Sequence, residues 1–164
     1  MATQVQFRRG TTSQHGSFTG AVGEVTVDTD KDTVVVHDGS QAGGFAIPNL
    51  KTAQEFTKTQ NFNATTLSDA STIAWDASSN QVAKVTLGGN RILGAATNQV
   101  DGAVYVLTVI QDGSGGRTLS FNANYKFTGG SAPTLTTTAS ATDVIVFLSN
   151  GTNMLEIGRS LNVS

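Results

Sequence analysis

The sequence has 164 residues, of which 38% are hydrophobic and only 13% are charged, and its formal net charge is −2. That length suits one ordinary domain or two small ones, and the charge balance excludes a protein that grips nucleic-acid phosphates. The sequence contains no cysteine, which excludes disulfides and thiolate metal sites, and no stretch approaches the roughly 18 apolar residues of a membrane span. Glycine, threonine and serine are abundant where charged residues are few, and this balance favours strands and turns over helices. We therefore expect an all-β protein.

The N-terminal segment predicts a short strand and one helical turn. Residues 4–9 place Val5 and Phe7 on one face of the strand, and Thr11 is a suitable N-cap for the turn that ends at Gly16. The first ten residues lack an apolar core, so we expect no secretory signal and synthesis in a cytoplasm.

A β-hairpin is predicted next. Residues 24–28 alternate between apolar and polar, a DTDKD turn follows, and residues 33–37 form a second strand that is apolar on both faces. A module of about fifty residues without disulfide or metal is too small to cover both faces, so we expect residues 1–48 to pack with copies of themselves. The residues expected at this interface are Val25, Val27, Val34, Val35 and Val36.

The character of the sequence changes after residue 48. Residues 49–70 have diluted helical spacing, which indicates a linker or a short helix between two modules. Residues 71–164 alternate short strand patterns with turn clusters, which is typical of an antiparallel β-sandwich with a jelly-roll-like arrangement. The strands are expected at residues 72–75, 82–87, 91–93, 103–111, 117–121, 125–127, 143–149 and 154–159.

Two of these strands, 103–111 and 143–149, offer no polar face to water. A sandwich buries one face of each strand, so the other apolar face predicts contact with a second chain. The residues expected there are Tyr105, Leu107, Val109, Ile145 and Phe147. An oligomer with cyclic symmetry explains both modules, because a closed ring leaves no sticky surface.

Two groups of residues invite a metal-site interpretation. Asp28, Asp30 and Asp32 are spaced like the first ligands of a calcium loop, but the sixth and twelfth positions hold Thr33 and Gly39 in place of glycine and glutamate. We therefore favour a simple turn over a calcium site.

The only two histidines, His15 and His37, lack a third zinc ligand at a recognisable spacing. We expect them to form hydrogen bonds at the ends of a helix and a strand. No metal or cofactor is expected.

Catalytic motifs are missing from the sequence. A glycan depolymerase needs two carboxylates across a cleft, and the spacing of Glu24, Glu55 and Glu156 gives no support for such a pair. We expect no catalytic residue, although depolymerase activity stays a remote alternative.

Residues 6–45 resemble the N-terminal module of bacteriophage tail-fibre and tropism-determinant proteins. The resemblance rests on four elements, which are Arg8-Arg9-Gly10-Thr11, Gln14-His15, Gly23-Glu24-Val25 and Val36-His37-Asp38-Gly39. Residues 82–157 resemble a β-rich module of phage fibre and head-decoration proteins, through VTL at 85–87, VIQD at 109–112, RTL at 117–119 and the stretches 129–135 and 147–153.

This resemblance implies an intertwined homotrimer located in the virion, with an N-terminal module that docks to the particle. The implied partners are the chain itself, other capsid or tail proteins, and a host surface glycan or protein. No nucleic-acid binding and no membrane insertion are expected. The function expected is host attachment by a tailed-phage fibre. The alternative is a capsid decoration or cement protein that stabilises the head.

Overall fold

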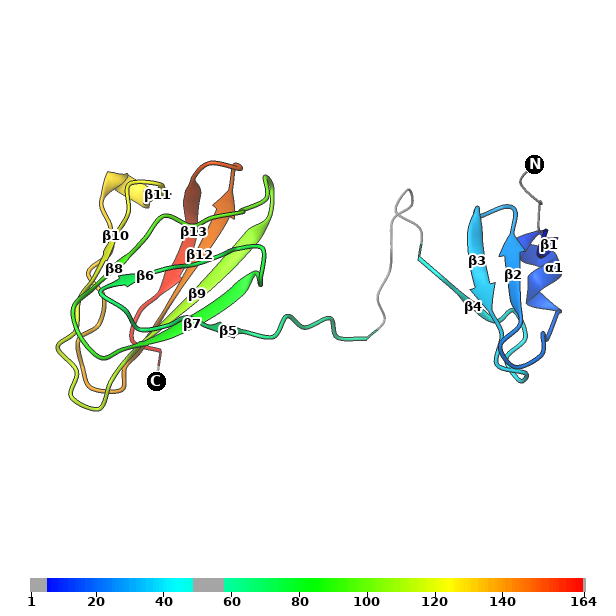
Figure 1. Cartoon of the computed structure of the whole chain (residues 1–164), viewed down its shortest axis with the longest axis horizontal. Helices are drawn as coiled ribbons and strands as arrows, with labels where there is room; N and C mark the ends of the chain where they lie inside the picture. The colour runs from blue at the N-terminus through cyan, green and yellow to red at the C-terminus, as the bar shows by residue number, and fades with distance from the viewer. Residues whose placement is uncertain (1–5, 49–57, 164) are drawn as a thin grey trace. The chain divides into compact units, whose positions relative to one another are not determined.

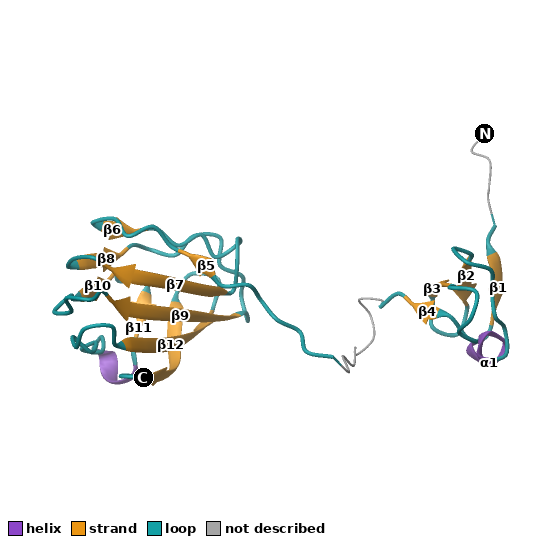
Figure 2. Cartoon of the chain, turned by 90° about the horizontal axis from the view of Figure 1, so that it is seen from below, coloured by secondary structure: helices purple, strands orange, loops and turns teal. Residues whose placement is uncertain are grey.

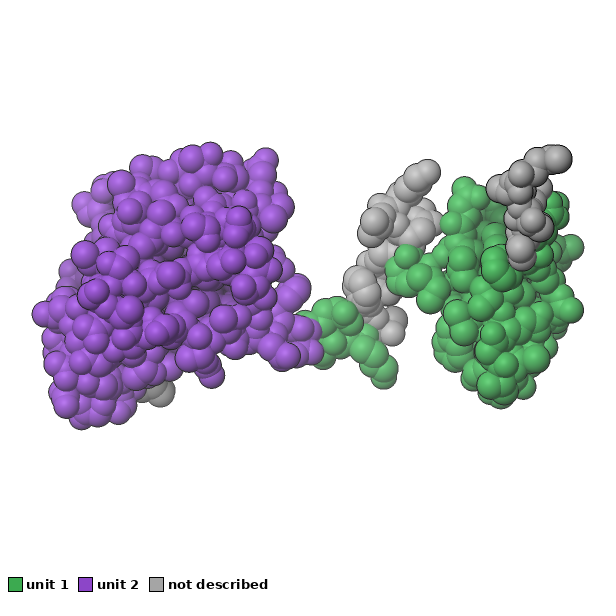
Figure 3. Space-filling model, in the orientation of Figure 1, with its two compact units in different colours: residues 1–60 green, residues 61–164 purple. Residues whose placement is uncertain are grey.

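The computed structural model describes residues 6–48 and 58–163. The chain divides into two compact units, Met1–Gln60 and Asn61–Ser164 (Figure 3). Among the described residues, the regular secondary structure of both units consists of strands apart from α1 and η1, so the predicted all-β class is confirmed. Part of the predicted linker, residues 49–57, lies outside the described residues, and residues 58–70 contain the short strand β5 and no helix. Among the described residues, no helix is long and apolar enough to cross a membrane.

The first unit is a four-stranded sheet with one short helix (Figure 1). The strand order is β1-β2-β3-β4, with β1 parallel to β2 and the other pairs antiparallel. The predicted hairpin is therefore confirmed as β2 and β3, whereas the strand predicted at 4–9 begins outside the described residues. The elements are β1 (Arg8–Gly10), α1 (Thr12–Gly16), β2 (Val25–Asp28), β3 (Thr33–Val36) and β4 (Phe45–Ala46).

Helix α1 starts where the sequence predicts it. The Gln14 N–H donates to the Thr11 hydroxyl (3.2 Å) and the Thr11 N–H donates to the Gln14 side-chain oxygen (2.9 Å), which forms a capping box. This cap fixes the position of His15, whose side chain points under the sheet and is buried.

The second unit consists of two packed sheets (Figure 2). The larger sheet has the order β11-β13-β12-β9-β7-β5 and the smaller one has the order β10-β8-β6. The strands are β5 (Thr65–Thr66), β6 (Thr72–Ile73), β7 (Val82–Leu87), β8 (Arg91–Leu93), β9 (Val104–Gln111), β10 (Leu119–Phe121), β11 (Tyr125–Lys126), β12 (Thr142–Ser149) and β13 (Met154–Ser160). A single turn of 3-10 helix, η1 (Thr128–Gly130), follows β11.

The predicted sandwich is present, but its pairing is mixed and not wholly antiparallel. β7 pairs with β9 in parallel, and the smaller sheet is parallel throughout. The reason is that the turn at 88–90 leads from β7 into the opposite sheet, so that β9 re-enters the larger sheet in the same direction as β7. Only β12 and β13 form the expected hairpin, with a bulge next to Val146 and Phe147.

The core of the second unit lies between its sheets. Trp75 and Tyr105 are almost fully buried, and their rings meet edge to face with centroids 6.0 Å apart. The Val100 N–H donates to the Tyr105 hydroxyl over 3.0 Å, which satisfies its polar end. Aliphatic side chains of β7, β9 and β12 fill the remaining space, and each stabilises the unit by about 1.5–3 kcal/mol through burial.

Candidate functional site

The sheet of the first unit has one buried face and one exposed face. The side chains of Thr26 and Asp28 point inward and are 0% and 3% exposed, whereas Val34 and Val36 point outward and are 41% and 36% exposed. This alternation follows from the two-residue period of a strand. The outward residues Val25, Val27, Val34, Val36 and Phe45 form an apolar surface that we call the valine face.

The strand register makes the valine face continuous. Val36 lies opposite Val25 on one side and Phe45 on the other, so that these three side chains form one row across the sheet. Val27 lies opposite Val34 in a second row. Side chains directly opposite each other on paired strands contact each other, so the side chains of the valine face pack against one another within a single chain.

One of the five valines predicted at the interface lies on the wrong face. Val35 is 2% exposed and belongs to the buried side of β3, next to Gly44. Its neighbours Val34 and Val36 point the other way, as strand geometry requires. The prediction for Val35 is therefore corrected, and the other four valines keep their place as interface candidates.

Two histidines and one threonine are joined beneath the sheet. His15 Nε2 lies 2.8 Å from the Thr26 hydroxyl oxygen, and His37 Nε2 lies 2.9 Å from the same oxygen. The Gly20 N–H donates to His37 Nδ1 over 3.3 Å, and His15 Nδ1 donates to the Thr11 carbonyl over 3.0 Å. These fixed ends define the tautomers, so His37 Nε2 donates to Thr26 and Thr26 donates to His15 Nε2. We call this group the bridged histidine pair.

The bridged histidine pair is held together by hydrogen bonds. Both Nε2 atoms are occupied by Thr26, and no group of three metal-ligating side chains occurs among residues 6–48 and 58–163. The predicted role of both histidines as hydrogen-bonding residues at element ends is confirmed.

The aspartates of the DTDKD segment form a turn, as expected. The Thr12 hydroxyl and the N–H groups of Asp30 and Lys31 donate to the Asp28 carboxylate. Burial opposes ionisation of Asp28, but these hydrogen bonds together lower its pKa below the usual value. Asp30 accepts from the Thr12 N–H (3.0 Å), so the first two carboxylates fasten the turn to the start of α1.

The interface predicted for the second unit is corrected by the structure. The side chains of Tyr105, Leu107, Val109, Ile145 and Phe147 are at most 2% exposed and lie in the core between the two sheets. These side chains are shielded from water by the rest of their own chain, so their burial does not require a second chain. Both faces of these strands are apolar, so the sequence pattern could not show which one points inward.

The opposite face of the same strands is the one that points outward. Val106 lies opposite Val146 and Val104 lies opposite Leu148, and all four side chains are partly exposed, Val104 to 42%. The outer surface of the larger sheet is therefore apolar along β9 and β12. These residues, and not the five that were predicted, are the apolar side chains that β9 and β12 leave partly exposed.

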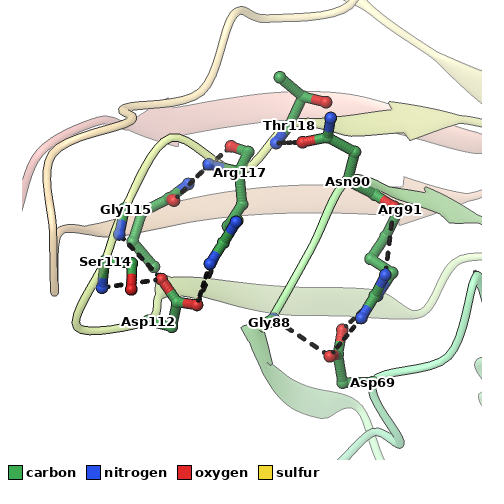
Figure 4. Close-up of polar contacts among 10 residues, drawn as sticks. Asp69, Gly88, Asn90, Arg91, Asp112, Ser114, Gly115, Arg117 and Thr118 are labelled. Atoms are coloured by element: carbon green, nitrogen blue, oxygen red, sulfur yellow. Dashed lines mark hydrogen bonds and ion pairs between the residues drawn. The ribbon is translucent and has the colours of Figure 1, made fainter.

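Charged side chains gather where loops meet at one end of the second unit (Figure 4). Arg91 donates to both carboxylate oxygens of Asp69 (2.7 and 2.8 Å), and Arg117 donates to Asp112 (2.8 and 3.1 Å). The guanidinium partners are the main reason why the pKa values of Asp69 and Asp112 lie below the usual range. Neither carboxyl group has the raised pKa that a general acid in glycan cleavage requires.

These two ion pairs were not predicted from the sequence. Asp69 and Arg91 are separated by 22 positions, and no spacing rule joins residues that far apart. Two of the three glutamates considered for catalysis form ion pairs in the structure. Glu24 pairs with Arg8 (2.8 Å), Glu156 pairs with Arg159, and Glu55 lies outside the described residues.

Two protein families match this chain, one in each unit. Residues 5–41 match the family described as major tropism determinant N-terminal domain. Residues 71–154, just over half of the chain, match the family described as putative phage tail fibre C-terminal domain. The chain belongs to this phage tail fibre family.

Individual relatives cover smaller shares. The tail fiber receptor-binding protein of Bordetella phage BPP-1 is 53% identical over 75 residues, which cover 39% of this chain and 20% of that protein. A solved structure of the major tropism determinant I1 variant is 69% identical over 27% of this chain and 12% of its own, with a TM-score of 0.27. The M1 variant is 25% identical over 93% of this chain and 42% of its own, with a TM-score of 0.31. The chain thus spans about a fifth of the length of the curated relative.

Proposed function

We propose that this protein is a non-enzymatic structural component of a tailed-bacteriophage particle, of the fibre type, and that it takes part in attachment to the host. The observation that carries this proposal is the match of residues 71–154 to a phage tail fibre family. The match of residues 5–41 to a tropism determinant domain supports it independently from the other unit. The names of these matches point to fibres and receptor binding, whereas nothing specific favours the capsid-decoration alternative.

We further propose that the chain works as a homotrimer assembled through the valine face. An exposed surface of this kind on a small unit is typical of an interface. Phe45 is 55% exposed in the edge strand β4, and Ile47, two residues later, is 50% exposed. Phe7, which precedes the other edge strand β1, is 57% exposed. Burying such side chains against copies of the same face would stabilise the assembly by about 25 cal/mol for each Å² removed from water.

The assembly is tested on the whole purified chain by light scattering. We expect a mass near three times the 17.0 kDa of one chain. A protein that stays monomeric at all concentrations would contradict the trimer but not the attachment function.

The attachment function is tested with fluorescently labelled protein on a panel of bacterial strains and on purified phage heads. We expect adsorption to permissive strains, and inhibition of infection when the protein is added before the phage. Heat-unfolded protein is the control. Binding to phage heads with greater resistance of the heads to heat, and no adsorption to any strain, would contradict attachment and favour decoration of the capsid.

A further inference from the structure

A polar groove of about 400 Å³ lies in the second unit, between residues 61–63 and the turn at 77–81. Every residue that lines it is uncharged, and its rim is composed of amide and hydroxyl side chains with one aromatic ring. Its volume falls within the usual range for a small-ligand site. Neither the ion pairs nor the apolar faces described above involve these residues.

The turn that forms one wall is held rigidly. Asp76 accepts hydrogen bonds from the N–H and the hydroxyl of Ser78 (3.0 and 2.7 Å) and from the side chain of Asn98 (3.0 Å). These donors lower the pKa of Asp76, which keeps it in the ionised form that binds them. The wall is therefore in place before a ligand arrives, which reduces the entropy lost on binding.

Two amide side chains in the groove are each fixed by one end only. The Asn80 side-chain oxygen accepts from the Val82 N–H (3.0 Å), which leaves its NH₂ group for a ligand. The Gln81 NH₂ group donates to the Val104 carbonyl (3.1 Å), which leaves its oxygen for a ligand. The groove thus presents one oriented donor and one oriented acceptor.

The aromatic ring belongs to Phe62, which is 61% exposed although it is a large apolar side chain. The floor includes the buried Ala77. An apolar ring beside paired neutral donors and acceptors matches the chemistry of a sugar, whose C–H face stacks on a ring and whose hydroxyls both donate and accept. A phosphate or carboxylate would find no cation among the lining residues, and a wholly apolar ligand would leave the amides unpaired.

We propose that this groove binds a neutral oligosaccharide. The proposal rests on the attachment function, because it names the class of surface molecule that the protein would meet on its host. It locates recognition in residues 61–63 and 77–81, which are separate from the valine face.

The test is binding of the full chain to a printed array of neutral and anionic oligosaccharides. We expect Phe62→Ala to weaken binding of a neutral glycan about tenfold through loss of stacking, and Phe62→Trp to retain it. Ile92→Ala is the matched control, because it removes another exposed apolar side chain of the same unit.

A second variant tests the amide. Asn80→Asp keeps an oxygen that accepts from the Val82 N–H but replaces the free NH₂ donor with a second carboxylate oxygen. We expect this variant to bind the same neutral glycan about tenfold more weakly than the unaltered protein does. Asn150→Asp is its control, because Asn150 also accepts turn N–H groups but lies outside the groove.

Binding to anionic glycans alone, binding to no glycan, or binding that both groove variants leave unchanged would overturn the proposal. The attachment function is judged separately, by adsorption of the same proteins to cells. Adsorption that survives in both groove variants would contradict the groove and leave attachment standing, whereas no adsorption by the unaltered protein would contradict attachment itself.

Discussion

Thr26 shows how much one side chain organises in the first unit. It is 0% exposed, and its hydroxyl forms a hydrogen bond with each of the two histidine rings. Gly20 completes the arrangement, since a Cβ there would lie 2.5 Å from the His37 ring and prevent its N–H from reaching Nδ1. Every ring nitrogen of the pair therefore has a hydrogen-bond partner.

Replacing Thr26 by valine should destabilise the first unit by about 2 kcal/mol. Valine fills the same space, but it leaves His37 Nε2–H and His15 Nε2 buried without a partner, and each unmet polar group costs about 1–3 kcal/mol. Hydrogen exchange followed by mass spectrometry on peptides covering residues 20–40 measures the effect locally. Thr19→Val, at an exposed position, is the control. Equal protection in both variants would show that the bridge contributes no stability.

The carboxylate of Asp28 should make the same unit sensitive to acid. Its pKa is lowered in the folded state, so the stability it provides is complete above the unfolded pKa of about 3.9 and disappears as the pH falls through the folded value. Asp28→Asn should weaken the unit at neutral pH by about 1–3 kcal/mol and flatten its pH dependence below about pH 4. Asp32→Asn is the control, because Asp32 is exposed in the same turn. An unchanged acid profile in Asp28→Asn would contradict this role.

At the scale of elements, the loop after β9 is held by close backbone approach. Gly115 has φ of +69°, and a Cβ there would lie 2.6 Å from the Thr137 carbonyl oxygen. Gly116 has φ of +75°, but a Cβ there would meet no atom within 4 Å. The two glycines share a left-handed conformation but differ in the space around them.

Alanine substitutions at Gly115 and Gly116 distinguish the cost of backbone strain from the cost of a steric clash. Gly116→Ala should cost about 1 kcal/mol for the left-handed backbone, and Gly115→Ala should cost about 2 kcal/mol more because the loop must move away from Thr137. Denaturant unfolding followed by fluorescence measures both, since the only tryptophan, Trp75, is buried in this unit. A similar loss in the free energy of unfolding for the two variants would mean that residues 137–139 move away from the new Cβ at little energetic cost.

At the scale of the whole molecule, the sequence predicted most strands of both units within about two residues. Local features carried this success, such as the alternation in 24–28 and the cap at Thr11. The errors have a common physical cause. Where both faces of a strand are apolar, as at Val35 or Leu107, the two-residue period separates the faces but does not tell which one is buried.

Contacts between segments that are distant in the chain could not be predicted from the sequence either. The polar groove joins residues 61–63 to 77–81, and Asp69, in the loop between β5 and β6, meets Arg91 at the start of β8. Likewise, nothing in the glycine turn at 88–90 shows that it leads to the opposite sheet and makes β7 and β9 parallel. Such features depend on the path of the chain, which local propensity does not determine.

The proposed trimer can be tested by a charge placed on or off the valine face. Val34→Asp puts a carboxylate at the centre of that face, where burial against a second chain without a partner would cost about 3–5 kcal/mol. We expect its mass in solution to fall toward that of one chain, and its melting temperature to lose the dependence on concentration that assembly imposes. Val22→Asp is matched in charge and in residue type, but Val22 is 83% exposed in the turn before β2 and should leave the trimer intact. A Val34→Asp protein that keeps the trimeric mass would mean that this face is open to water, and that the chains meet through another surface.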